Sequence, residues 1–198
     1  CPGCDTDYTS IRKSMSPREI VAAIPRDLMR QGLVVITGGE PFRQNLTGLL
    51  SNLLSAGYYV QIETNGTLSP PAQYFNILTG TGFYYNQNPC EHDGVYIVCS
   101  PKAGKVHPEV WSNACCVKYV AKAGNISAHD GLPITALNHS VKDCVARPPI
   151  DWHKPIYLQP MDEQNALYNT ANIHAVRDSC LKFGYTLQLQ VHKYIGVE

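Results

Sequence analysis

The sequence predicts an α/β fold built on parallel strands. Residues 33–37 (LVVIT) and 58–63 (YYVQIE) are short apolar runs rich in β-branched and aromatic residues, and a helical leucine repeat at 45–56 separates them. A strand, a helix and a second strand with short connections are typical of a right-handed parallel crossover. Polar clusters follow the ends of these runs, which is where parallel sheets bind ligands.

Length and composition narrow the class of protein. The chain has 198 residues, 44% of them hydrophobic, which is enough for one sizeable core, so we expect a single domain. Lys and Arg together number 16 and balance 16 Asp and Glu, so net charge favours neither nucleic acid nor an anionic membrane as a partner. The sequence contains no apolar run of about 18 residues, the minimum for a membrane-spanning helix. The expected partner is a small molecule.

The first predicted helix begins after Ser16. Pro17 suits the first helical position, and Glu19 can reach back to the Ser16 amide. We expect this helix to reach about Arg30, with a kink or a break at Pro25, which has no amide donor.

The strand at 33–37 and the helix at 45–56 follow. Continuous apolar runs are typical of strands buried on both faces, and we expect this of residues 33–37. Gly57 stands where a C-terminal cap belongs. The apolar positions of the helix recur at helical spacing: Leu46, Leu49, Leu50, Leu53 and Leu54.

The second half of the chain repeats the alternation. We expect a helix at 170–183 with Ile173, Val176 and Cys180 facing inward. Residues 68–94 and 121–150 are rich in Gly, Pro and Asn and are predicted to be long loops or local elaborations. The predicted strands are 95–99, 115–120, 156–159 and 185–191.

The cysteines leave two cellular settings open. Eight cysteines and four Asn-x-Ser/Thr patterns permit a secreted, disulfide-linked glycoprotein. A chain of this size does not need disulfides, and one of the patterns, at Asn65, falls inside a predicted ligand site. We therefore favour a reducing, cytoplasmic setting.

The pair Cys1 and Cys4 in CPGC permits three kinds of site. It is compatible with a thiol-disulfide oxidoreductase, whose first thiol has a lowered pKa, or with an iron-sulfur cluster held by closely spaced thiolates. A zinc ribbon would need a second such pair, and the adjacent Cys115 and Cys116 within an apolar strand do not supply one.

Five polar clusters follow predicted strands. Each has an ordinary structural explanation, because paired glycines make tight turns and prolines end strands. Their common position at the carboxyl ends of parallel strands instead indicates one ligand site. The clusters are TGGEP (37–41), ETNGT (63–67), SPK (100–102), QPMD (159–162) and HK (192–193).

These motifs together resemble one family. CPGCDT, ITGGEP, IETNGT, SPK, LQP and the ending LQVHKYIGVE occur in the order seen in the 7-carboxy-7-deazaguanine synthase family of radical S-adenosylmethionine (SAM) enzymes. The resemblance implies a partial parallel (β/α) barrel of about six strands, radical SAM type. It also implies that residues 1–198 form a single radical SAM domain, with the N-terminal strand and the first cluster cysteine expected upstream of residue 1.

The resemblance assigns ligands to this site. A [4Fe-4S] cluster is implied on Cys1 and Cys4, and Mg²⁺ on Thr6, whose hydroxyl suits that ion. Gly38 and Gly39 would let the chain approach SAM closely, and Glu40 would take its ammonium group. The implied SAM-binding residues are Gly38, Gly39, Glu40, Gly66, Ser100, Pro101, Lys102, Gln159, Pro160, Met161 and Asp162, and the implied substrate contacts are Thr64, His192 and the terminal carboxylate of Glu198.

The implied activity is that of a lyase. It converts 6-carboxytetrahydropterin to 7-carboxy-7-deazaguanine with loss of ammonia, in queuosine or related deazapurine synthesis, with an external electron donor and a homodimeric enzyme. Two alternatives use parts of the same pattern. A radical SAM activase acting on a protein partner shares the cluster and GGEP-like elements, and a thiol-disulfide oxidoreductase or metal-binding module needs only Cys1 and Cys4.

Overall fold

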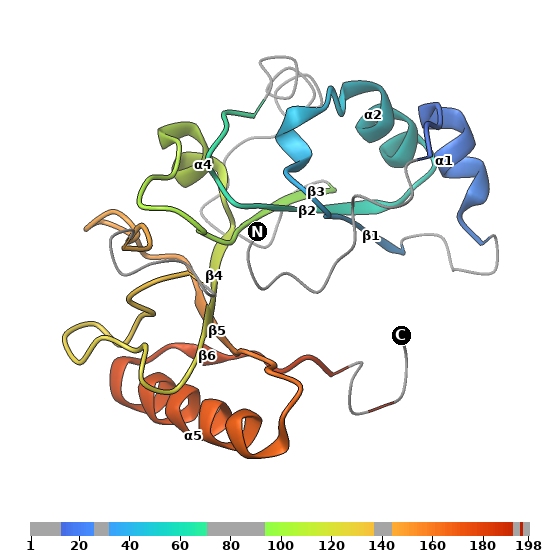
Figure 1. The fold of residues 1–198 in the computed structure, drawn as a ribbon. Coiled ribbons are helices and arrows are strands. Elements are labelled where there is room, and N and C mark those ends of the chain that lie inside the picture. The colour runs from blue at the N-terminus through green and yellow to red at the C-terminus, as the bar shows by residue number, and fades with distance from the viewer. Residues whose placement is uncertain (1–12, 26–31, 71–93, 137–143, 192–194, 196–198) are drawn as a thin grey trace. The chain divides into compact units, whose positions relative to one another are not determined.

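The computed structural model describes residues 13–25, 32–70, 94–136, 144–191 and 195 (Figure 1). These residues belong to two compact units. The N-terminal unit holds the described residues within 4–99 and 107–115, and the C-terminal unit holds those within 100–106 and 116–198.

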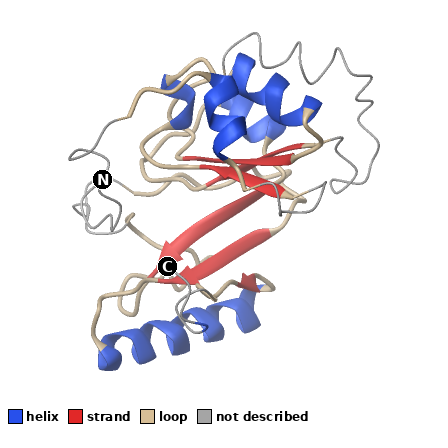
Figure 2. Cartoon of the chain, turned by 90° about the vertical axis from the view of Figure 1, so that its right-hand side faces the viewer, coloured by secondary structure: helices blue, strands red, loops and turns tan. Residues whose placement is uncertain are grey.

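The N-terminal unit is built on three parallel strands in chain order. These are β1 (Leu33–Ile36), β2 (Tyr59–Thr64) and β3 (Val95–Cys99). Helix α2 (Thr47–Ser55) connects β1 to β2 and contacts β2. The helices of this unit lie over one face of its strands (Figure 2). The predicted strand-helix-strand crossover is confirmed.

Apolar burial holds α2 in place. The side chains of Leu50 and Leu53 are fully buried, as are Val60 and Ile62 of β2. The helix ends at Ser55 with Ala56 as its C-cap, and Gly57 follows with a φ of 85°, a backbone conformation that glycine adopts without strain. The helical leucine repeat and its glycine stop are therefore correctly predicted.

The described residues of this unit include three further helical segments. Helix α1 (Pro17–Ala23) begins with the predicted reciprocal hydrogen bonds between Ser16 and Glu19. It ends before Pro25, as expected, and the predicted extension toward Arg30 falls outside the described residues. The short helices η1 (Pro41–Arg43) and α4 (Pro108–Asn113) were not predicted, because they are too short to show a helical repeat.

One prediction about β1 is wrong. The strand is not buried on both faces: its residues alternate between exposed and half-buried, with Leu33 55% and Val35 45% exposed. The physical reason is its position at the end of the strand order, where β2 is its neighbour. A run of apolar residues therefore does not indicate on how many faces the strand is covered.

The C-terminal unit also has three parallel strands in chain order. These are β4 (Cys116–Ala121), β5 (Ile156–Pro160) and β6 (Thr186–Leu187). The predicted strand at 185–191 is wrong in length, because only Thr186 and Leu187 pair with β5. The Gln188 amide still donates a hydrogen bond to the Leu158 carbonyl of β5 at 2.9 Å, but strand pairing does not continue beyond it in the described part of the chain.

Helix α5 (Ala166–Phe183) connects β5 to β6 and lies alongside both strands (Figure 1). It begins four residues earlier than predicted, because the Asn165 side chain accepts hydrogen bonds from the amides of Leu167 and Tyr168. Val176 and Cys180 are buried and Ile173 is half-buried, in agreement with the predicted inward face.

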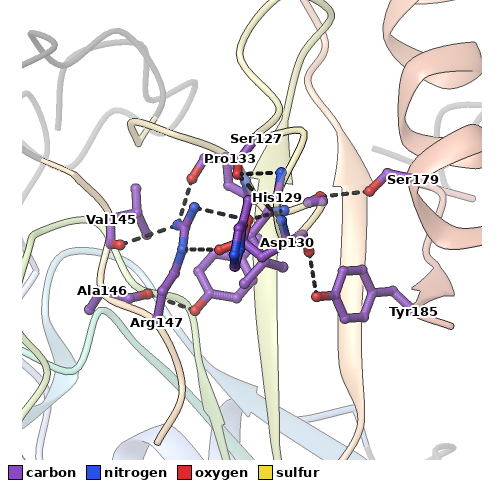
Figure 3. A network of polar contacts seen from close by, with 12 residues as sticks. Ser127, His129, Asp130, Pro133, Val145, Ala146, Arg147, Ser179 and Tyr185 are labelled. Carbon is purple, nitrogen blue, oxygen red and sulfur yellow. Dashed lines mark hydrogen bonds and ion pairs between the residues drawn. The ribbon is translucent and has the colours of Figure 1, made fainter. Parts of the chain in front are cut away.

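The connection from β4 to β5, residues 122–155, contains no helix in its described part. Two isolated β-bridges, Ile126 with Pro133 and Thr135 with Cys144, shape it instead. A polar network around Asp130 and Arg147 holds it (Figure 3). The predicted local elaboration at 121–150 is thus confirmed where the structure describes it.

Six strands are present among the described residues, and the pairs β1–β2, β2–β3, β4–β5 and β5–β6 are parallel. The α/β fold with about six parallel strands is therefore confirmed. Within the described residues, no helix is both long and apolar enough to cross a membrane.

Candidate active site

The carboxyl ends of β1, β2 and β3 bring two of the predicted clusters together. Ile36 at the end of β1 pairs with Ile62, and Thr64 at the end of β2 pairs with Cys99 at the end of β3. Residues 37–40 and 64–66 therefore leave the sheet at one edge. This is the edge at which parallel α/β folds bind their ligands.

Glu40 joins these two segments. Its side chain is buried, and its carboxylate accepts hydrogen bonds from the Thr64 hydroxyl at 2.7 Å, the Asn65 amide at 2.9 Å and the Phe42 amide at 3.2 Å. All of these donors are electrically neutral. Among the described residues, no Lys, Arg or His forms an ion pair with this carboxylate.

The Thr64 hydroxyl is fixed by the same contacts. It donates its hydrogen to Glu40 and accepts a hydrogen bond from the Gly66 amide at 3.0 Å. The hydroxyl oxygen has two lone pairs, so it can accept one more hydrogen bond and donate none. Thr64 is 1% exposed, which holds it in this arrangement.

The two glycines before Glu40 leave room beside the backbone. Gly38 has a φ of 117°, a conformation that other residues rarely adopt, and apart from the adjacent residues no heavy atom of the described part of the chain lies within 4 Å of the position a Cβ would take at Gly38 or Gly39. A ligand can therefore approach the main chain closely at this turn. Gly66, with a φ of 76°, is held by its carbonyl, which accepts a hydrogen bond from the His107 amide at 2.7 Å.

The remaining described clusters lie in the C-terminal unit. The Lys102 ammonium donates a hydrogen bond to the Ser100 hydroxyl at 3.1 Å, and Ser100 and Pro101 are buried. This contact orients the lysine head group. The spacing of two residues in the Ser-Pro-Lys cluster allows the side chains of Ser100 and Lys102 to make this contact.

A pocket of about 270 Å³ opens after β5. Gln159 lies half-buried within β5, next to the three residues of the predicted cluster that reach the pocket. The Asp162 carboxylate accepts hydrogen bonds at 2.8 Å from the Asn169 side chain and from the Gln164 amide. The pocket is lined by Pro160, Met161, Asp162, Asn169, Ile173, Leu189 and Gln190.

Five predicted site residues lie outside the described residues: Cys1, Cys4, Thr6, His192 and Glu198. Their predicted roles stay predictions. Within the described residues, no three His, Cys, Asp or Glu side chains gather as a metal site would require.

Several residues that contact these clusters were not predicted from the sequence. Asn169 and Asn172 were overlooked because the inward face of the helix was sought among apolar positions. The Asn-x-x-Asn spacing was the available signal, since residues three apart share a helix face. His107 was missed because it caps the unpredicted helix α4, where its Nδ1 accepts a hydrogen bond from the Glu109 amide.

Several known enzymes are similar in sequence to this chain. No protein-family model matches the chain. The 7-carboxy-7-deazaguanine synthase of Rhodospirillum rubrum is 33% identical over 204 residues, covering all of this chain and 79% of that protein. The enzyme of the same name from Rickettsia prowazekii is 29% identical over 208 residues, covering all of this chain and 75% of that protein.

A solved structure shares the fold. The crystal structure of QueE from Escherichia coli has a TM-score of 0.53 and 20% sequence identity, and the match covers 89% of this chain and 64% of that one. At this identity the likeness supports the fold alone. It agrees with the fold class predicted from the sequence, an α/β fold of the radical SAM type.

Parallel strands with polar clusters at their carboxyl ends define an α/β protein with a ligand site at that edge. The full-length match at 33% identity goes further: the chain belongs to the 7-carboxy-7-deazaguanine synthase family. It is thus a radical SAM lyase of the queuosine pathway that acts on a small molecule.

Proposed function

We propose that the protein converts 6-carboxy-5,6,7,8-tetrahydropterin to 7-carboxy-7-deazaguanine with loss of ammonia. The observation that carries this proposal is the Glu40 carboxylate. It is buried, receives hydrogen bonds only from neutral donors among the described residues, and stands beside an open glycine turn. Burial of a carboxylate is unfavourable unless an opposite charge or several donors accompany it. The ammonium group of SAM would complete this set.

The other SAM contacts follow from the same clusters. Gly38 and Gly39 would let the main chain reach the methionyl end of SAM, and Gly66 would present backbone groups held by His107. Ser100, Pro101 and Lys102 form a second contact group, and Gln159, Pro160, Met161 and Asp162 form a third. The ordered Lys102–Ser100 contact and the pocket after β5 support these assignments.

Cys1 and Cys4 would hold a [4Fe-4S] cluster, and Thr6 would bind Mg²⁺. Thiolates at close spacing and a hydroxyl oxygen are the ligand types that these two groups take. Such a cluster supplies the electron that cleaves SAM and starts radical chemistry on the substrate. The protein binds and orients the reactants and keeps water from them.

Thr64 would face the substrate, together with His192 and the terminal carboxylate of Glu198. The Thr64 hydrogen is already donated to Glu40, so the substrate must offer this hydroxyl a donor, such as a ring N–H. Through this one hydrogen bond, the proposed substrate contact and the proposed SAM contact fix each other. A shift of either bound ligand would therefore change the position of the other.

Three broader features complete the proposal. The chain would form a single radical SAM domain, would work as a homodimer, and would receive its electron from an external donor. An oxygen-sensitive cluster fits a reducing, cytoplasmic setting. The thiols of Cys144 and Cys180, which are not in disulfides, agree with that setting.

The decisive experiment is anaerobic turnover of the full-length protein with SAM, a reductant and 6-carboxytetrahydropterin. We expect a deazapurine product by mass spectrometry. Cleavage of SAM without a deazapurine would instead support an activase, and the absence of both reactions in cluster-loaded protein would contradict the proposal.

A cysteine pair supplies the matched control. Cys4→Ala should abolish cluster binding and turnover, whereas Cys144→Ala, at an exposed cysteine outside the site, should keep both. Iron content and the visible absorption of the cluster measure the first effect. Full iron content and turnover in Cys4→Ala would refute the cluster assignment.

A further inference from the structure

Two asparagines of α5 contact the segment that follows β5. Asn172 is 2% exposed, and both polar atoms of its side chain are hydrogen-bonded: its Oδ1 accepts a hydrogen bond from the Ala123 amide at 2.8 Å, and its Nδ2 donates to the Met161 carbonyl at 2.9 Å. Asn172 therefore links the segment after β4 to the segment after β5.

Asn169, three residues earlier on the same helix face, hydrogen-bonds to the two residues that follow Met161. Its Nδ2 donates to the Asp162 carboxylate at 2.8 Å, and its Oδ1 accepts from the Glu163 amide at 2.8 Å. Asn169 also lines the pocket after β5. The two side chains together fix three successive residues, 161–163.

Other contacts complete the restraint. The Met161 amide donates to the Ala121 carbonyl at 2.8 Å, so both main-chain groups of Met161 are bonded. Lys122 lies 3.6 Å from the Glu163 carboxylate. Gln164 has a φ of 54°, a left-handed conformation that non-glycine residues rarely adopt, and its amide bonds to Asp162. The turn is thus held in an uncommon conformation by its neighbours.

Helix formation alone does not explain these asparagines. Asparagine is less favourable than alanine in a helix interior, because its side chain competes for backbone hydrogen bonds. Both side chains instead satisfy groups outside the helix. Their position next to the pocket makes that segment, rather than the helix, the feature that they stabilise.

We infer that Asn169 and Asn172 are positioning residues for SAM, which act by fixing Met161 and Asp162 at the edge of the pocket. This inference rests on the proposed function, because it takes 159–162 as part of the SAM site. Neither asparagine needs to touch the cofactor. Loss of either side chain leaves the turn free to relax, so the bound geometry must be formed anew at each binding event.

The test measures SAM binding and stability separately. In full-length, cluster-loaded protein under anaerobic conditions, Asn169→Ala and Asn172→Ala should each raise the dissociation constant of SAM about tenfold, the scale of one lost buried hydrogen bond. The KM for SAM should rise with it. Asn172→Asp keeps the acceptor for Ala123 but loses the donor to Met161, and it should weaken binding as much as Asn172→Ala.

Ser179→Ala is the matched control. Ser179 lies on the same helix, is 5% exposed, and donates a hydrogen bond to the Gly131 carbonyl at 2.6 Å, away from the pocket. This variant should lower the thermal midpoint as the asparagine variants do, yet keep the SAM dissociation constant within about twofold, as expected of an independent site.

The outcomes are distinct. Unchanged SAM affinity in Asn169→Ala and Asn172→Ala overturns the inference and leaves the proposed function standing. Equal loss of affinity in Ser179→Ala also overturns it, because the effect would then follow stability alone. Failure of the cluster-loaded wild-type protein to bind SAM overturns the proposed function, and the inference with it.

Discussion

Two connections between neighbouring parallel strands are built differently in this chain. The β1–β2 connection carries helix α2, whose Leu50 and Leu53 are fully buried next to a strand with buried Val60 and Ile62. The β4–β5 connection, residues 122–155, has no helix in its described part and carries a polar network beside the buried side chains of Leu132 and Val145. Both complete a parallel pair.

Arg147 organises the polar connection. Its guanidinium contacts both oxygens of the Asp130 carboxylate, at 2.8 and 3.3 Å, and donates to the carbonyls of Pro133 at 2.7 Å and Val145 at 3.3 Å (Figure 3). The Tyr185 hydroxyl donates to the Asp130 carbonyl at 2.6 Å. One arginine therefore joins residues 130, 133 and 145 of a connection that has no helix in its described part.

The difference has a physical consequence. Apolar burial stabilises a connection in proportion to the area removed from water and is insensitive to protonation. A carboxylate-guanidinium network depends on the charge of its members and on the geometry of each bond. The first connection should therefore respond to lost volume, and the second to lost charge.

The largest effect is expected in the apolar connection. Leu50→Ala should lower the free energy of unfolding by about 3 kcal/mol, because it removes buried methyl groups and leaves a cavity. Chemical denaturation measures this change. Leu181→Ala makes the same substitution at a residue that is 79% exposed, and it should change stability by less than about 0.5 kcal/mol. Equal losses in the two variants would contradict the role given to α2.

A smaller effect is expected in the polar connection. Arg147→Ala should lower the free energy of unfolding by about 2 kcal/mol at neutral pH, because it leaves the partly buried Asp130 carboxylate and the carbonyls of Pro133 and Val145 without this donor. Arg147→Lys keeps the charge but loses the forked geometry, so it should recover only part of the loss. The same denaturation experiment checks both variants. Full recovery in Arg147→Lys would show that charge alone suffices.

The two connections also differ in how well the sequence predicts them. Leucines at helical spacing, closed by Gly57, identified α2 because burial of one helix face imposes that period. Nothing in the sequence pairs Asp130 with Arg147, which are 17 residues apart, since an ion pair across a loop has no period. The structure was needed to find it.

The candidate site shows the same limit. The positions of Glu40, Thr64 and Asp162 at or just beyond strand ends were predictable, because strand ends define the ligand-binding edge. The hydrogen bond from Thr64 to Glu40 was not, since it depends on how β1 and β2 align. The contacts of Asn169 and Asn172 were hidden for the same reason, as they join a helix to turns elsewhere in the chain.

The smallest expected effect is a dependence of stability on pH, which the polar β4–β5 connection should show and the apolar β1–β2 connection should not. Partial burial opposes ionisation of Asp130, but hydrogen bonds from the Leu132 amide, Ser127 and Arg147, with the Arg147 charge, outweigh it and lower the pKa of this carboxyl below its ordinary value. A carboxyl with a lowered pKa in the folded state contributes its stability above the ordinary pKa and loses it as the pH falls through the folded-state pKa. Because Asp130 is partly solvated, we expect this contribution to be no more than about 1 kcal/mol.

Asp130→Asn tests this contribution. The variant should be less stable than the wild-type protein at pH 7, and the difference should shrink as the pH falls below the ordinary pKa of an aspartate, about 3.9, and through the lower pKa of the folded-state carboxyl. Denaturation at a series of pH values measures the difference. Ser179→Ala removes an uncharged contact of the same network, so its loss of stability should not vary over this range. A constant difference between Asp130→Asn and wild type would mean that geometry, rather than charge, holds the β4–β5 connection.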